Sequence, residues 1–122
     1  MTRQDALRFA ADWIEAWNAR DVERVLATFE DDVEFTSPRA LVTVGVATVQ
    51  GKQALRSYWQ TALARVTSLR FTLDRALWDP ESLELAIVYV SNVNAEQKRV
   101  SENFRFGPSG KVAAVQVFHG VA

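Results

Sequence analysis

The chain has 122 residues, a formal net charge of −1 and no cysteine. This length fits one domain spanning 1–122, and an apolar share of 48% with four Trp is enough for a core. The absence of cysteine excludes disulfides, thiol nucleophiles and iron–sulfur clusters, and the small net charge gives no electrostatic reason to bind nucleic acid or anionic lipid.

Three amphipathic helices are predicted, each with one apolar face. The first is expected over about 3–19 after a Thr2 cap, the second after the N-cap Asp21, and the third after Gly51. The apolar face of the first carries Leu7, Ala10, Ala11, Trp13, Ile14 and Trp17. The second carries Val22, Val25, Leu26 and Phe29, and the third carries Ala54, Leu55, Tyr58, Trp59, Ala62, Leu63 and Val66.

The rest of the chain alternates with the period of a β-strand. Strands are expected at 33–37, 69–79, 83–94, 97–106 and 111–120, and residues 41–49 are interpreted as a further strand or small hairpin. The strand at 83–94 is apolar on both faces from Ala86 to Val90, as expected for a central strand covered twice. This order predicts an α+β fold with a curved, mostly antiparallel sheet wrapped around the helices.

The last predicted hairpin places two titratable groups on its apolar face. Pairing Phe106 with Lys111 across the turn at 107–110 sets Glu102 opposite Val115. The core-facing side then carries Val100, Glu102, Phe104, Phe106, Val115, Val117 and His119. A single carboxylate and the chain's one histidine are therefore expected to point into the core.

A carboxylate on such a face is desolvated, so a raised pKa is expected for Glu102. That suits a general acid or base, and His119 is the natural second titrating group. In this register the two stand four positions apart, roughly 13 Å, and would flank a ligand from two sides.

Structural roles compete with each of these assignments. Glu102 would alternatively pair with Arg56 or Arg65, or sit at a cavity mouth. His119, close to the end of the sequence, would be partly exposed or simply hydrogen-bonded, and the Trp13 and Trp17 indoles would be core. Arg39 and Arg75 are expected to be solvated.

Other chemistries lack their motifs. One histidine without cysteine makes no recognisable metal cluster, and HExxH, EF-hand, GxGxxG, Walker A and GxSxG patterns are missing from the sequence. We therefore expect no metal and no cofactor. The charged N-terminal segment does not read as a signal peptide and no window reads as a membrane span, so a cytoplasmic location without membrane contact is expected.

Five short segments, taken in order, resemble the nuclear transport factor 2-like superfamily in its SnoaL-like and ketosteroid-isomerase-like branch. They are 17–21 (WNARD), 29–33 (FEDDV), 51–55 (GKQAL), 102–106 (ENFRF) and 110–112 (GKV). The resemblance implies a cone-shaped α+β barrel in which a strongly bent mixed sheet and three helices enclose a deep pocket. It also implies a homodimer formed through the outer sheet face.

The resemblance also assigns positions in this pocket. Trp13 stands where ketosteroid isomerases have the Tyr that donates to the substrate oxyanion, and Ser37, before Pro38, stands where they have the Asp base. Glu102 takes the place of their protonated Asp. Trp59 replaces a helix-three Tyr, while His119 and Tyr89 line the last and the central strand. The base and the donor Tyr are thus lost, which argues against standard ketosteroid isomerisation.

The leading hypothesis is a cofactor-independent isomerase, dehydratase or cyclase that acts by proton transfer on a small lipophilic cyclic or carbonyl metabolite. Glu102 and His119 would be catalytic, with Ser37 at the mouth of the pocket. The other substrate-binding residues would be Trp13, Trp17, Phe35, Trp59 and Tyr89. The alternatives are a non-catalytic binding protein for an apolar ligand and a structural dimer module. The last alternative predicts a filled pocket and an apolar outer patch at Val88, Val90, Val112, Ala114 and Phe118.

Overall fold

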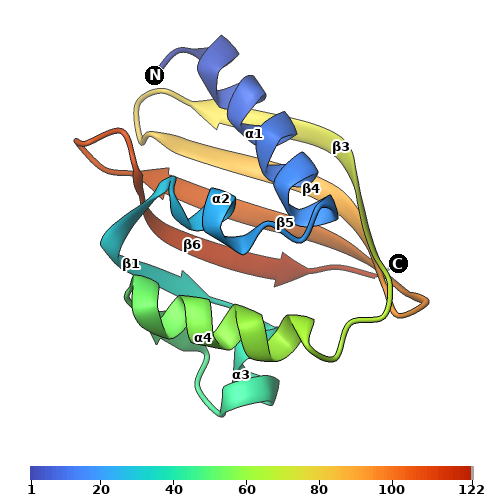
Figure 1. The fold of residues 1–122 in the computed structure, drawn as a ribbon. Coiled ribbons are helices and arrows are strands. Elements are labelled where there is room, and N and C mark those ends of the chain that lie inside the picture. Colours follow the sequence, from blue (N-terminus) through green and yellow to red (C-terminus); the bar gives the residue numbers. More distant parts are fainter. Residues whose placement is uncertain (122) are drawn as a thin grey trace.

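In the described part of the chain, four helices and two strands come first, and four further strands follow. In the computed structural model, which describes residues 1–121, the elements are α1 (Arg3–Asn18), α2 (Val22–Leu26), β1 (Phe29–Thr36), α3 (Pro38–Val44), β2 (Thr48–Gln50), α4 (Lys52–Leu63), β3 (Leu69–Asp79), β4 (Glu84–Val93), β5 (Glu96–Phe106) and β6 (Val112–His119). Figure 1 shows α1, α2 and α4 on one face of the sheet.

The strands form one curled sheet in the order β2-β1-β6-β5-β4-β3. Among the strands of residues 1–121, the β1–β6 pair alone is parallel and every other neighbouring pair is antiparallel. The predicted α+β class and mixed, mostly antiparallel sheet are confirmed. The sheet does not close into a full barrel, because β2 and β3 remain its edges within residues 1–121.

Helix α1 lies against β3 with a face that differs from the predicted one. The Thr2 side chain accepts from the Asp5 N–H and the Asp5 carboxylate accepts from the Thr2 N–H, so the predicted cap is confirmed as a full capping box. The buried residues are Ala6, Ala10, Trp13, Ala16 and Trp17. Leu7 is 38% exposed and Ala11 is exposed, because the two indoles, four positions apart, set which face turns inward.

The prediction of a strand at 41–49 is wrong over most of its length. Residues 38–44 form α3, and only Thr48–Gln50 pairs in the sheet. The Ser37 side chain caps this helix by accepting from the Arg39 N–H, Pro38 occupies its first turn, and Gly45 ends it at φ +81°. These local stop and start signals outweigh the β-propensity of the Val and Thr residues between them.

The final hairpin has the predicted parity but not the predicted register. Phe106 pairs with Val112, not with Lys111, and an irregularity separates it from Arg105, which pairs with Ala114. Glu102 is therefore opposite Val117, and His119 is opposite Val100. The irregularity also turns Val112 into the core, so it does not belong to the outer patch predicted for it.

The two faces of β4 are covered unequally. Leu85, Ile87 and Tyr89 are buried under the helices, whereas Val88 and Val90 on the opposite face are only half-buried. The expectation that this strand is covered on both faces is not met within the described chain.

Candidate functional site

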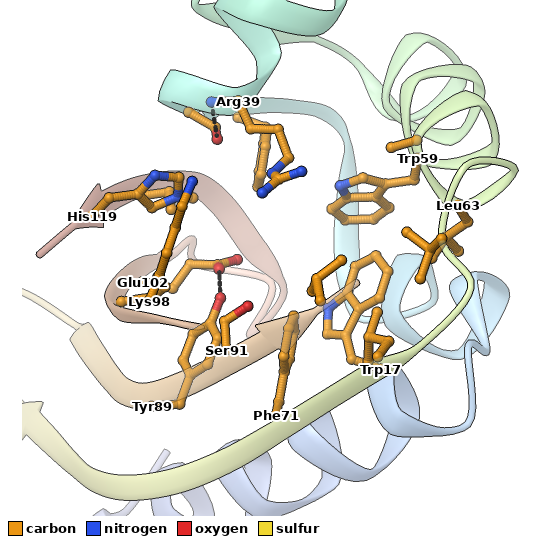
Figure 2. A pocket seen from close by; sticks show the side chains of 18 of the residues that line it. Trp17, Arg39, Trp59, Leu63, Phe71, Tyr89, Ser91, Lys98, Glu102 and His119 are labelled. Carbon is orange, nitrogen blue, oxygen red and sulfur yellow. Dashed lines mark hydrogen bonds between the residues drawn. The ribbon is translucent and has the colours of Figure 1, made fainter. Parts of the chain in front are cut away.

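A cavity of about 130 Å³ opens between the helices and one end of the sheet. Helices α1 and α4 form one wall, and strands β4, β5 and β6 form the opposite wall. All eight residues singled out from the sequence line it, namely Trp13, Trp17, Phe35, Ser37, Trp59, Tyr89, Glu102 and His119. Figure 2 shows polar side chains gathered on the left and indole and aliphatic side chains on the right.

Glu102 lies in the polar wall and is only 6% exposed. Its Oε1 accepts a hydrogen bond of 2.7 Å from the Tyr89 hydroxyl, drawn as a dashed line in Figure 2. Residues 1–121 place no cationic nitrogen within 4 Å of it, and the alternative of a pair with Arg56 is wrong because Arg56 binds Glu23. Glu102 is thus a buried carboxyl group held by one hydroxyl.

This environment makes Glu102 titrate near neutrality. Burial raises the pKa of Glu102 to about 7, although the hydrogen bond from Tyr89 acts in the opposite direction. Burial, followed by the Glu102 charge, raises the pKa of the Tyr89 hydroxyl well above its ordinary value, so Tyr89 stays a donor. Near pH 7 both the acid and the carboxylate form of Glu102 are therefore populated.

His119 is a half-buried neighbour of Glu102 on the next strand. Because Glu102 pairs with Val117, His119 is its diagonal neighbour, about 7–8 Å away between Cα atoms and not four positions along. Burial, then the positive charges of Lys98 and Arg39, lower the pKa of the imidazole. At neutral pH the His119 imidazole is therefore neutral and can accept a proton, and it lies on the same face of the sheet as Glu102.

Ser37 is not at the mouth of the pocket. It is buried, and its Oγ holds the first turn of α3 by accepting from the Arg39 N–H. The mouth position belongs to Arg39, whose guanidinium points into the cavity in Figure 2. Arg39 is exposed, as expected of a solvated residue, but it also lines the cavity, which the sequence did not predict.

Lys98 is a second cationic lining residue that sequence reasoning missed. It lies on β5 with the same parity as Val100 and Glu102, so extending the alternation by one step would have found it. Arg39 gave no comparable signal, because it lies between the predicted strands at 33–37 and 41–49 and no helix was predicted there.

Indoles dominate the opposite wall. Trp17 packs edge-to-face on Trp59 with ring centroids 4.9 Å apart, and Trp13 contacts Tyr89 with centroids 5.2 Å apart. Within residues 1–121, the buried Nε1 atoms of Trp13 and Trp17 have no hydrogen-bond acceptor. A buried donor without an acceptor costs free energy, so these two N–H groups lower the stability of the fold.

Two further features bear on the class of site. Groups of three or more metal-ligating side chains are not found among residues 1–121. None of the helices described is long and apolar enough to cross a membrane.

Comparison with known proteins identifies a family and a fold. A family model described as a SnoaL-like domain matches residues 10–119. No curated protein sequence matches the chain. Among solved structures, a SnoaL-like protein of unknown function from Burkholderia thailandensis is 29% identical, with a TM-score of 0.88 over 98% of this chain and 97% of that one.

Two more solved structures share the fold at lower identity. An NTF2-like protein of unknown function from Burkholderia pseudomallei is 18% identical, with a TM-score of 0.79 over 98% of this chain and 92% of that one. The BvnE pinacolase from Penicillium brevicompactum is 17% identical, with a TM-score of 0.78 over 98% of this chain and 88% of that one. At these identities the likeness concerns the fold alone.

Proposed function

The chain belongs to the SnoaL-like domain family, and we propose that it is an acid/base enzyme that moves protons on a small lipophilic carbonyl or cyclic compound. The reaction class is isomerisation, dehydration or cyclisation. Glu102 and His119 carry the proton transfer. The observation that supports this most is a carboxyl group buried in an open cavity with a pKa of about 7.

The pKa of Glu102 and the lowered pKa of His119 suit this role. A general acid or base works best when its pKa is close to the working pH, because both protonation states are then accessible. Glu102 meets that condition, and His119 is neutral beside it. A carboxylate at Glu102 removes a proton from carbon or oxygen of the substrate, and the Glu102 acid that forms returns it to another atom. When Glu102 starts as the acid and donates first, the neutral imidazole of His119 accepts the proton that the substrate releases.

The opposite wall supplies binding and orientation. The indoles of Trp13, Trp17 and Trp59 offer flat apolar contact, and the unpaired N–H groups of the first two suit a carbonyl oxygen. The cavity volume of about 130 Å³ is close to that of an engineered cavity that takes up benzene. The enclosed part of a substrate is therefore one ring or a short chain.

The pinacolase among the solved structures supports the proposal only weakly. It shows that this fold, at 17% identity, accommodates an enzyme of that name. What it binds is not transferred to this chain.

A non-catalytic binding protein is the second candidate. The indole-rich wall with two unpaired N–H groups favours it, because these features recognise a ligand without any proton transfer. The third reading, a structural module with a filled pocket, has the wrong geometry, since the pocket is open.

Substitution of Glu102 separates the first two candidates. Native mass spectrometry of the purified protein identifies a bound ligand. Turnover is then measured with single-ring enones, lactones and hydroxyketones as substrates. Glu102→Gln keeps the shape but removes the titrating group, and we expect a loss in kcat of about 10²–10⁴-fold with little change in binding. The exposed Glu84→Gln variant is the matched control.

Turnover on a confirmed substrate that is equal in Glu102→Gln and the unchanged protein would remove Glu102 from the mechanism. Saturable binding without turnover of any compound that binds would support the second candidate.

We further propose a homodimer through the outer sheet face. Phe118 is 52% exposed and Leu77 is 58% exposed there, next to half-buried Val88 and Val90. Sedimentation velocity should give a dimer mass, and Phe118→Glu should shift it to the monomer. A monomer at all concentrations in the unchanged protein contradicts this arrangement.

A further inference from the structure

The cavity is apolar at one end and cationic at the other. Arg39 from α3 and Lys98 from β5 reach the same end of the cavity as His119 from β6. In Figure 2 Lys98 and His119 lie on one side, the Arg39 guanidinium points inward, and Trp17, Trp59 and Leu63 lie across the cavity. Three separate elements thus bring basic groups to one mouth.

Within the described part of the chain, little negative charge faces these cations. Within residues 1–121, no carboxylate oxygen lies within 4 Å of the Arg39 guanidinium, whereas Arg24, Arg56 and Arg99 each have such a partner. Lys98 has Glu96 at 3.2 Å, but the Glu96 side chain is 64% exposed and that of Lys98 only 31%. An exposed ion pair of this kind is worth little and leaves the ammonium able to bind a second anion.

Glu102 is not the missing partner. It lies in the same cavity, yet neither cation is within 4 Å of its carboxyl group, and its one hydrogen bond comes from Tyr89. Burial keeps part of the Glu102 population neutral at pH 7. Burial raises the pKa of Tyr58 and of Tyr89 and lowers the pKa of His119. The positive charge of Arg39 makes a smaller contribution that lowers all three, so its field reaches the cavity.

We propose that the ligand of this pocket is an amphiphilic carboxylic acid: one apolar ring or short chain against Trp17, Trp59 and Leu63, and a carboxylate at Arg39 and Lys98. This rests on the proposed function only in taking the cavity as the ligand site. The guanidinium offers two parallel N–H donors to a carboxylate, and the ammonium adds a point charge. The overall charge of −1 makes this cationic mouth a local feature and not a general property of the surface.

Matched acids and amides test the carboxylate. Indole fluorescence is titrated with benzoate, phenylacetate and 3-phenylpropanoate, and with the amide of each, which keeps the size but removes the charge. We expect at least one acid to bind about tenfold or more tightly than its amide, and the preference to weaken as salt rises. The chain length that binds best reports the span from the indoles to the two cations.

Variants locate the effect. Arg39→Gln and Lys98→Gln should each reduce the acid preference severalfold, and Arg39→Lys should restore part of it. Arg105→Gln is the matched control, because Arg105 is an exposed cation on the same strand as Lys98 but lies outside the cavity. It should leave the preference unchanged.

Three results overturn the proposal: equal affinity for each acid and its amide, no binding of any acid at millimolar concentration, or an equal loss in Arg39→Gln and Arg105→Gln. The proposed catalysis fails separately. An acid preference that depends on Arg39, in a protein that turns over none of its ligands, would keep this inference and reject the enzyme.

Discussion

The two walls of the pocket have opposite effects on the free energy of folding. On the helical wall, Trp13, Trp17 and Trp59 bury large apolar surfaces in edge-to-face contact, which stabilises the fold. On the strand wall, Glu102 occupies a buried position where an apolar side chain would cost nothing. Because Glu102 lowers stability and faces a cavity, a functional role explains its presence better than a structural one.

Replacing Trp17 tests the stabilising wall and should have the largest effect on stability. Trp17→Ala removes the edge-to-face contact with Trp59 and enlarges the cavity, so we expect the free energy of unfolding to fall by about 3–5 kcal/mol. Urea denaturation followed by circular dichroism measures it. A loss under about 1 kcal/mol would mean that this wall contributes little to the core.

Replacing Glu102 tests the destabilising wall, and the expected change in the free energy of unfolding depends on pH. The folded-state pKa of about 7 exceeds the unfolded value of 4.5, so the native state holds an extra proton in that interval and stability falls as pH rises through it. At pH 8 we expect Glu102→Gln to be more stable than the unchanged protein by about 3 kcal/mol.

At pH 4 the two proteins should differ by about 1 kcal/mol or less, because Glu102 is then neutral in both states. Urea midpoints at the two pH values, with Glu84→Gln in parallel as an exposed control, give the comparison. A difference that is the same at pH 4 and pH 8 would show that Glu102 is not desolvated.

The hydrogen bond from Tyr89 is the next smaller effect. Because this bond favours the charged form, its loss in Tyr89→Phe should raise the pKa of Glu102 further. Stability should fall by about 1–2 kcal/mol at pH 8, where the carboxylate loses its one donor, and by less at pH 5. Carboxyl ¹³C chemical shifts against pH give the Glu102 titration directly; a lower pKa in the variant contradicts this reasoning.

The two walls also differ in how far the sequence predicted them. Strand alternation put Glu102 and His119 on the inner face correctly, because parity survives an error in register. The distance between them was wrong, since the irregularity next to Phe106 shifts the pairing by an amount that no side-chain pattern encodes.

On the helical side, the helix at 3–18 is predicted correctly, but its buried face is not: Leu7 was expected on that face and is exposed. Because the helix has apolar residues such as Leu7 beside the face that carries Trp13 and Trp17, the sequence pattern does not show which of these residues pack against the sheet. The helix at 38–44 was missed because its evidence is capping by Ser37, Pro38 and Gly45, not periodicity. Because this helix was not predicted, the position of Arg39 at the mouth of the pocket was not predicted either.

The smallest effect concerns the Trp17 indole N–H, which separates apolar packing from ligand recognition within one side chain. Trp17→Phe loses part of the buried apolar surface, which costs stability, but it also removes a buried donor without an acceptor, which gains about 1–3 kcal/mol. The two terms offset, so we expect the free energy of unfolding to change by about 1 kcal/mol or less.

Ligand binding should respond differently from stability in the same variant. A ligand that has an oxygen acceptor toward Trp17 should lose about fivefold or more in affinity in Trp17→Phe, while a ligand of the same shape without that acceptor should lose little. Isothermal titration with cyclohexanone and methylenecyclohexane compares the two. An equal loss for both would mean that Trp17 contributes only apolar contact, and that the helical wall holds a ligand in place without orienting its carbonyl group.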